Sequence, residues 1–293
     1  TSSGVFTPTV SGTFPIQYLV ISNSGCRDSV TRNLTVWPRP IAVWGTSTPL
    51  CENNAIRFLD TSRALIGNIV QWQWNFGDGR RDTFTNGNAF NRTYASFNTY
   101  NASLTVVTDS GCISTATSRT LVVHPLPRVS FTVPAGVCLP NGDASFTNST
   151  TIPDGTGATL QYLWTFGDAA NPTPSVQINP THRYTALGSK TVRLVVTSVN
   201  GCVDSSTQVF SNIFPQPRAG FTASTNFVCV GDAINFSDTS NGLTSAVTNW
   251  RWFFGDGGTS TVQNPTYTFN NVGAFTVRQV ITNNQGCISD TAN

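Results

Sequence analysis

The 293-residue chain is poor in the residues that favour helices, with one lysine, one glutamate and no methionine. These residue types are among the stronger helix formers. The chain instead contains 24 glycines and 16 prolines, and serine, threonine and asparagine are abundant. Long helices are therefore excluded as the main element, and the composition predicts an all-β fold.

Charge and long apolar runs are also scarce. Charged residues make up 10% of the chain, and the formal net charge is +2. Such a balance gives no electrostatic footprint for a nucleic acid or an anionic membrane surface, so we expect neither as a partner. No run approaches the 18 apolar residues of a membrane span. An aromatic content of 11% argues against disorder.

Catalytic residue types are few, because the chain has one glutamate and two histidines, His124 and His182. No Gly-x-Ser-x-Gly elbow supports a serine nucleophile. Metal ligands are equally scarce, with no Cys-x-x-Cys spacing. We therefore predict no enzyme, no resident cofactor and no metal centre in this chain.

The sequence repeats itself with a period of about 88 residues. A Gly-Cys pair ends at Cys26, Cys112, Cys202 and Cys287, and an aromatic-Gly-Asp string recurs in the same rhythm. We call this string the turn motif, because glycine allows positive φ and aspartate binds its own backbone. It comprises Gly77, Asp78 and Gly79; Gly167 and Asp168, with Ala169 in place of a glycine; and Gly255, Asp256 and Gly257.

Pro-x-Pro segments begin at Pro38, Pro125 and Pro215 and mark joints between repeats, because proline fixes φ and donates no hydrogen bond. They divide the chain into a partial repeat at 1–37, domains at 38–124 and 125–214, and a domain at 215–293 that lacks its last strand. Both ends then fall inside a repeat, and we expect the parent to be a longer tandem array.

The segment before each turn motif alternates with period two, as expected of a strand with one buried face. Three large rings per repeat would supply much of the core. They are Trp72, Trp74 and Phe76; Tyr162, Trp164 and Phe166; and Trp250, Trp252 and Phe254. A second strand precedes each Gly-Cys pair. Its inward set in the partial repeat is Ile16, Tyr18 and Val20, and in the last repeat it includes Gln279, whose amide would need a sheet edge or a hydrogen-bond partner.

Each full repeat holds one early cysteine and one late cysteine, the latter within the Gly-Cys pair. We expect bridges inside each repeat, pairing Cys51 with Cys112, Cys138 with Cys202, and Cys229 with Cys287. Cys26 is then a late cysteine without a partner in this sequence. Each bridge would contribute about 4 kcal/mol in the chain-entropy model and would indicate an exported protein. Free buried cysteines are the alternative.

The string Phe-x-Asp/Asn, Trp-x-Phe-Gly-Asp-Gly, Asn-Pro-Thr-x-Tyr and Gly-Cys resembles the PKD (polycystic kidney disease) domain. Examples are Phe58-Leu59-Asp60, Trp74-Asn75-Phe76-Gly77-Asp78-Gly79 and Asn179-Pro180-Thr181. The resemblance covers nearly the whole chain. It implies tandem immunoglobulin-like β-sandwiches, and the cysteine-paired form resembles repeats of very large bacterial surface and gliding-associated adhesins.

We therefore expect an extracellular structural or adhesive rod within a longer surface protein, about 100–130 Å long from its strand lengths, which spaces a tip from the cell. Its expected partners are neighbouring repeats of the same chain, like chains in a filament, or surface glycans and proteins. The alternative is a polysaccharide- or protein-binding accessory module of a secreted hydrolase. Calcium held between domains by linker carbonyls also stays open, although one carboxylate per turn motif is few for that ion.

Overall fold

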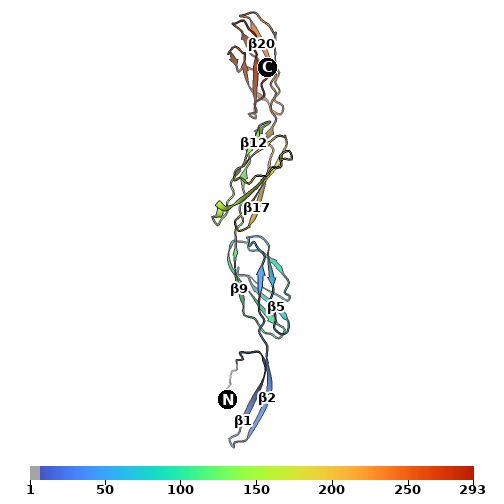
Figure 1. Cartoon of the computed structure of the whole chain (residues 1–293), viewed down its shortest axis with the longest axis vertical. Helices are drawn as coiled ribbons and strands as arrows, with labels where there is room; N and C mark the ends of the chain where they lie inside the picture. Colours follow the sequence, from blue (N-terminus) through green and yellow to red (C-terminus); the bar gives the residue numbers. More distant parts are fainter. Residues whose placement is uncertain (1–6) are drawn as a thin grey trace. The chain divides into compact units, whose positions relative to one another are not determined.

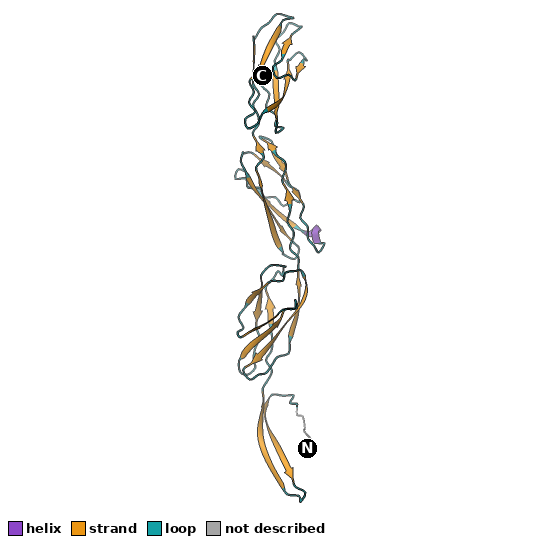
Figure 2. Ribbon diagram, turned by 180° about the vertical axis from the view of Figure 1, so that it is seen from behind, coloured by secondary structure: helices purple, strands orange, loops and turns teal. Residues whose placement is uncertain are grey.

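The computed structural model describes residues 7–293. The chain divides into two compact units, Thr1–Leu126 and Pro127–Asn293, and each is described by itself. The prediction of an all-β chain is confirmed: Figure 2 shows strands throughout and one short 3-10 turn, η1 (Thr156–Thr159). No helix among residues 7–293 is long and apolar enough to cross a membrane.

The first two strands described in the first unit, β1 (Gly12–Ile21) and β2 (Arg27–Val36), form a hairpin of two ten-residue antiparallel strands (Figure 1). The sequence predicted that Ile16, Tyr18 and Val20 would face a core. That prediction is wrong in the described structure, where these side chains are 44%, 66% and 49% exposed. The strand is present, but no second sheet among residues 7–126 covers its apolar face.

The rest of the first unit forms two sheets around one core. One sheet has the order β3-β4-β7 and the other β6-β5-β8-β9. The strands are β3 (Trp44–Thr46), β4 (Ile56–Asp60), β5 (Ile69–Asn75), β6 (Arg81–Phe84), β7 (Phe90–Arg92), β8 (Asn98–Thr108) and β9 (Thr117–Val123). Trp74 and Phe76 are buried between the sheets, and Trp74 packs edge-on against Trp44 and Phe58.

The second unit contains two further β-sandwiches. The first has small sheets β10-β13, β12-β15 and β11-β18 and a larger sheet β14-β16-β17. Its strands are β10 (Phe131–Thr132), β11 (Val137–Cys138), β12 (Gly142–Ser145), β13 (Thr147–Asn148), β14 (Gln161–Thr165), β15 (Thr181–Tyr184), β16 (Lys190–Thr197), β17 (Val203–Phe210) and β18 (Ile213–Phe214). The core contains Trp164 and Phe166, and Tyr162 is partly buried against it.

The second sandwich of this unit has the sheets β19-β20-β23 and β22-β21-β24. Its strands are β19 (Phe221–Ala223), β20 (Ala233–Asp238), β21 (Val247–Phe253), β22 (Thr259–Ser260), β23 (Thr266–Thr268) and β24 (Arg278–Asn283). Trp252 and Phe254 are buried in its core, with Trp250 partly buried beside them. Among the described residues β24 has β21 on one side and, on the other, only the isolated bridges of Gln279 to Ala292 and Thr282 to Ile288.

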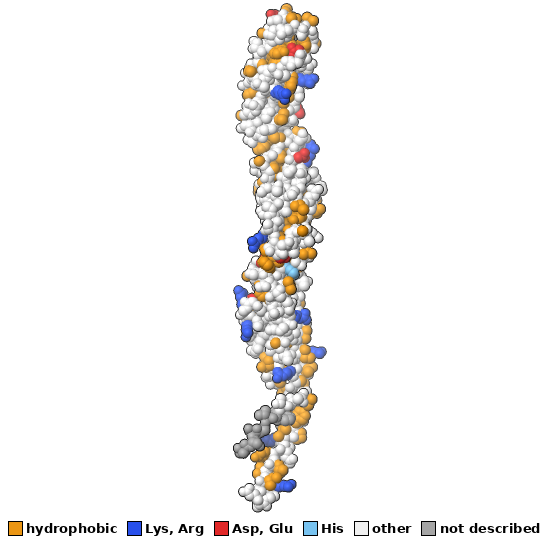
Figure 3. Space-filling model, turned by 90° about the vertical axis from the view of Figure 1, so that its left-hand side faces the viewer, with side chains coloured by type: hydrophobic (Ala, Val, Ile, Leu, Met, Phe, Trp, Pro, Cys, Tyr) orange, Lys and Arg blue, Asp and Glu red, His pale blue; other side chains and the backbone are white. Residues whose placement is uncertain are grey.

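The surface matches the low content of charged residues in the sequence. Figure 3 shows side chains that are neither charged nor apolar, together with backbone, over much of the visible face, with basic and acidic groups scattered singly.

Candidate functional site

The turn motif has the same local geometry in all three repeats. In each copy the aspartate accepts a hydrogen bond from the backbone N–H two residues further on. These donors are Arg80 at 3.1 Å, Ala170 at 3.2 Å and Gly258 at 2.9 Å. The repeat with Ala169 keeps this bond, since the donor belongs to the following residue. The carboxylates are thus engaged in holding the turn.

The first glycine of the motif is required by space as well as by conformation. Gly77, Gly167 and Gly255 have φ of 78°, 63° and 87°. A Cβ on Gly77 would lie 2.6 Å from the Asn101 carbonyl oxygen, and one on Gly167 would lie 2.6 Å from the Thr191 backbone. The turn therefore packs against the strand that precedes the Gly-Cys pair, and only glycine fits.

A different side chain meets the turn aspartate in each repeat, always from the same position of the facing strand. Arg92 lies 3.1 Å from Asp78, His182 Nε2 lies 3.1 Å from Asp168 Oδ2, and Tyr267 Oη donates to Asp256 at 2.9 Å.

Each of these three partners also stacks on the phenylalanine of its own turn. The Arg92 guanidinium lies 3.7 Å from the Phe76 ring centre, and the rings of His182 and Tyr267 lie 4.3 and 3.7 Å from those of their phenylalanines. We call this arrangement the turn lock: one side chain binds the turn aspartate and stacks on the turn phenylalanine. A guanidinium, an imidazole and a phenol each fill this position in one repeat.

These contacts shift the ionisation of the carboxyls. Burial alone would raise the pKa of Asp168, but hydrogen bonds from His182 and the Ala170 N–H and the charge of Lys190 outweigh it and lower that pKa. Lys190 Nζ lies 3.7 Å from Asp168 Oδ1. Burial would likewise raise the pKa of Asp78, but contacts with Arg80 and Arg92 outweigh it and lower that pKa. Because these neighbours hold the carboxylates in the charged form, the turn aspartates are better suited to stabilising the fold than to transferring protons.

A second carboxylate holds the buried amide of Gln279, a side chain with no exposed surface. Gln279 Nε2 donates to Asp238 Oδ1 at 2.8 Å, and its Oε1 accepts from Ser240 at 3.1 Å. Trp250 Nε1 donates to the other oxygen of Asp238 at 2.7 Å. Trp72 and Asp60 form the same indole–carboxylate bond in the first unit, also at 2.7 Å. The amide therefore has the partner that the sequence required of it.

The loop that carries each late cysteine is built identically four times. The residue four positions before the cysteine accepts the cysteine N–H through its side-chain oxygen and pairs with it through the backbone. The acceptors are Ser22, Thr108, Ser198 and Asn283, at 3.1, 3.1, 3.2 and 2.9 Å. The glycine of every Gly-Cys pair has φ between 77° and 83°. The loop therefore holds the cysteine backbone in the same way, whether or not the sulfur is bonded.

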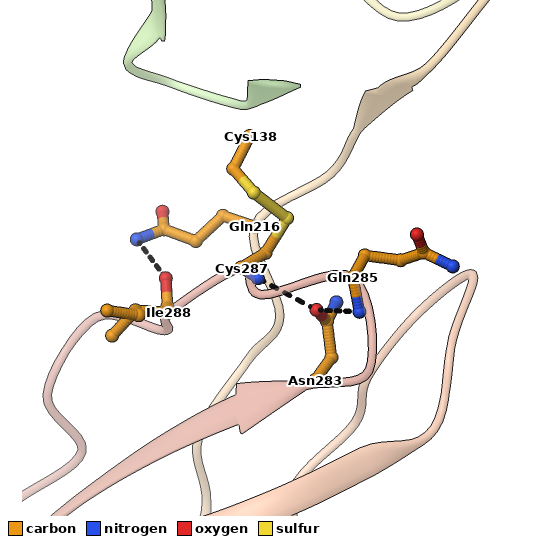
Figure 4. Close-up of a disulfide and its surroundings, with 6 residues drawn as sticks. All are labelled: Cys138, Gln216, Asn283, Gln285, Cys287 and Ile288. Carbon is orange, nitrogen blue, oxygen red and sulfur yellow. Dashed lines mark hydrogen bonds between the residues drawn. A yellow bond between two sulfur atoms is a disulfide. The ribbon is translucent and has the colours of Figure 1, made fainter. Parts of the chain in front are cut away.

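The cysteines join two sandwiches of the second unit. Cys138 of β11 is disulfide-bonded to Cys287, with the Cα atoms 5.5 Å apart and a separation of 149 positions in sequence (Figure 4). Across the same joint, Gln216 of the Pro-x-Pro segment donates through Nε2 to the Ile288 carbonyl at 3.3 Å. β11 pairs in parallel with β18, which leads into the joint. We call this combination of cystine, parallel pair and Pro-x-Pro segment the cystine joint.

Comparison with known proteins assigns these sandwiches. A family model described as the PKD domain matches residues 37–123, 135–212 and 215–293, which together are most of the chain. The chain belongs to the PKD domain family. PKD repeats are typically non-catalytic, and repeats that carry disulfides are typical of extracellular proteins.

Solved structures of similar fold include the PKD1 domain of Vibrio anguillarum Epp, with 26% identity over 30% of this chain and 96% of that chain, at a TM-score of 0.27. Eight immunoglobulin domains of Down Syndrome Cell Adhesion Molecule match at 13% identity over 96% of this chain and 39% of that one, at 0.44. A 1.5-MDa bacterial ice-binding adhesin matches at 9% identity over 86% and 96%, at 0.36.

The expected disulfides inside each PKD repeat are wrong. Because Cys138 is bonded to Cys287, neither the pair of Cys138 with Cys202 nor that of Cys229 with Cys287 forms. Cys112 and Cys229 are free, as is Cys26, while Cys51 and Cys202 are disulfide-bonded. The early and late cysteines of one repeat are thus not bonded to each other. Since every repeat carries both kinds, counting cysteines and spacing could not tell the two schemes apart.

The remaining candidate features of the PKD repeats give no binding site. Trp44 is 1% exposed in the core, and its Nε1 donates to the Thr117 carbonyl at 2.8 Å. Trp37, which directly precedes the first Pro-x-Pro segment, is 45% exposed. Between residues 7 and 293, no cluster of three histidine, cysteine, aspartate or glutamate side chains could hold a metal ion.

Proposed function

We propose that this chain is a load-bearing spacer segment of an extracellular tandem-repeat protein, anchored at a cell surface and displaying an adhesive or enzymatic tip. The observation that carries the proposal is the cystine joint, because a covalent bond between Cys138 and Cys287 bypasses the Pro-x-Pro linker. A pull on the chain is then shared between the peptide linker and the bond. A spacer needs this property, whereas a freestanding binding module does not.

The turn locks and the aromatic cores support the same proposal. They give each repeat a buried framework, and the ionisable groups of the turns face protein partners within their own repeat. The outer face, which carries few charges and is rich in serine, threonine and asparagine, also suits lateral packing of like chains into a filament.

Single-molecule stretching of the whole chain tests the spacer function. With the disulfides intact, the length released between residues 138 and 287 should be absent from the unfolding record, because the bond withholds it. After reduction, the unfolding steps of the two sandwiches that this bond withholds should appear. Unchanged records before and after reduction would contradict a load-bearing role.

The rival function is an accessory module that holds a secreted hydrolase on a polysaccharide or protein. Such modules need a row of exposed rings, and the exposed aromatics of residues 7–293, among them Tyr18, Trp37 and Phe227, lie far apart in the sequence. Binding of the oxidised chain on a glycan array would favour this rival.

A further inference from the structure

The cystine at Cys138 and Cys287 follows a rule of position. It joins the early cysteine of one PKD repeat to the late cysteine of the repeat that follows. Cys51, an early cysteine, and Cys202, a late cysteine, are each disulfide-bonded as well.

The free late cysteine Cys112 lies in the same local setting as Cys287. Its loop has the shared hydrogen bonds, and Arg39 Nη1 donates to the Ile113 carbonyl at 2.7 Å. Arg39 is the middle residue of its Pro-x-Pro segment, as Gln216 is of the one beside Cys287. The loop of a free late cysteine is therefore already shaped for a cystine joint.

The free early cysteine Cys229 lies at the corresponding open end of the last repeat. Cys229 is exposed, and among the described residues no strand pairs with it in the way that β18 pairs with Cys138. It borders an open groove of about 1090 Å³, lined mainly by apolar side chains that include Val228, Phe236, Phe269 and Phe275. The adjoining side chains Phe227 and Val272 are 86% and 88% exposed.

The preceding repeat shows what chemistry fits this groove. There Phe210, at the end of β17, is 1% exposed and packs its ring against Phe146 and Tyr184 at 6.3 and 5.6 Å. Phe236 and Phe269, which line the groove, occupy the positions of Phe146 and Tyr184 in the repeat. The groove is thus shaped for an extended strand with an inward aromatic residue like Phe210 and an apolar residue like Ile213 three positions later.

We propose that Cys229 and this groove form a docking site for one further PKD repeat: the strand that leads into that repeat fills the groove, and the Gly-Cys loop of that repeat bonds covalently to Cys229. The proposal goes beyond the spacer function, because it specifies how successive repeats are linked and which sulfur accepts the next one.

The bond forms by thiol–disulfide exchange, with a small disulfide such as oxidised glutathione as the oxidant. The Cys229 thiolate attacks one glutathione sulfur and releases a glutathione thiolate, which takes up a proton. The thiolate of the incoming Gly-Cys loop then attacks the Cys229 sulfur and releases the second glutathione. Two protein thiols are oxidised to one disulfide, and one glutathione disulfide is reduced to two thiols.

The test extends the full chain by one repeat. Residues 209–293, carrying Cys229→Ser so that only the original Cys229 remains, are appended after Asn293, because Asn293 follows Cys287 at the distance at which Gln208 follows Cys202. The chain is refolded with oxidised and reduced glutathione, alkylated, digested without reduction and mapped by mass spectrometry. We expect Cys229 linked to the appended copy of Cys287, with the original Cys287 still bonded to Cys138. In the matched control, Cys287→Ser in the appended copy only, Cys229 should be alkylated.

Cys229 alkylated in the folded extended chain, or bonded to the original Cys287, would overturn the proposal. A second variant needs no extension: Cys287→Ser in the 293-residue chain should make Cys138 reactive while Cys229 stays reactive. A bond between Cys138 and Cys229 in that variant would also contradict the rule. These experiments report only which cysteines are bonded. A negative result would therefore overturn the docking proposal and leave the spacer function to be tested separately by single-molecule stretching.

Discussion

At the scale of single residues, the first glycine of the turn motif is the most demanding position. A Cβ on Gly167 would meet the Thr191 backbone at 2.6 Å at a φ of 63°. We predict that Gly167→Ala lowers the free energy of unfolding by about 3 kcal/mol or more, since strain and clash add. Denaturant unfolding measures it.

Gly188→Ala is the matched control for this substitution. Gly188 also has positive φ, at 98°, but a Cβ there meets nothing within 4 Å. It should cost about 1–2 kcal/mol, the conformational penalty alone. Equal losses at the two positions would contradict close packing of the turn against its neighbouring strand.

The Asp168 carboxyl predicts an acid sensitivity. Its pKa in the folded protein is lowered from the ordinary 3.8. A lowered pKa contributes stability that is fully present above the unfolded pKa and is lost as pH falls through the folded pKa. Stability should therefore be steady above about pH 5 and fall below about pH 4.

Thermal melts from pH 7 to pH 2.5 measure this dependence. Asp168→Asn should flatten the acid limb, and the exposed Asp143→Asn should leave it unchanged. If the Tm fell equally steeply at acid pH in Asp168→Asn and in the unsubstituted chain, Asp168 would not be a source of the acid sensitivity.

At the scale of elements, Asp238 at the end of β20 binds side chains from β21 and β24, and so links the two sheets of the last repeat. Asp238→Ala leaves the buried Gln279 amide and the Trp250 N–H without their acceptor. We predict a loss of about 2–4 kcal/mol, measured by denaturant unfolding. Asp232→Ala, at an exposed aspartate of the same repeat, should cost under about 0.5 kcal/mol. Equal losses would show that the linkage carries no stability.

The strands were predictable from the sequence because a buried face imposes period two, and large rings mark that face. The alternation at Trp74 and Phe76 is seen directly in their burial. The inward face assigned to Tyr18 failed, because alternation shows which side is apolar but not whether a second sheet covers it. The partners of the turn aspartates were not predictable either, since Arg92, His182 and Tyr267 share a position but no chemistry.

The disulfide pairing failed for a different physical reason. In a tandem array every early cysteine has a late cysteine in its own repeat and another in the next, and sequence spacing alone gives no preference. The choice depends on where the Gly-Cys loop lies relative to the joint. The Pro-x-Pro segments do carry a signal of this position. Their middle residues Arg39 and Gln216 each donate a hydrogen bond to the carbonyl of the residue after a late cysteine.

At the scale of the whole molecule, the cystine joint should couple the stabilities of the repeats it connects. In the chain-entropy model, a bond that closes 149 residues contributes up to about 5 kcal/mol. We predict that Cys287→Ser lowers the Tm by about 10 °C or more and separates one cooperative transition of residues 127–293 into two. Calorimetry measures both effects.

Cys229→Ser is the matched control in this experiment, because Cys229 is free and exposed. It should leave the Tm and the shape of the transition unchanged. A loss of the same size in both variants would indicate that the sulfur at Cys287 matters for packing and not for coupling.

The most direct measurement of the central claim is disulfide mapping of the oxidised 293-residue chain after alkylation of free thiols and digestion without reduction. The account predicts a linked peptide pair containing Cys138 and Cys287, with Cys112 and Cys229 carrying the alkyl label. Peptides that link Cys138 to Cys202, or Cys229 to Cys287, would place the bonds inside the repeats and contradict it.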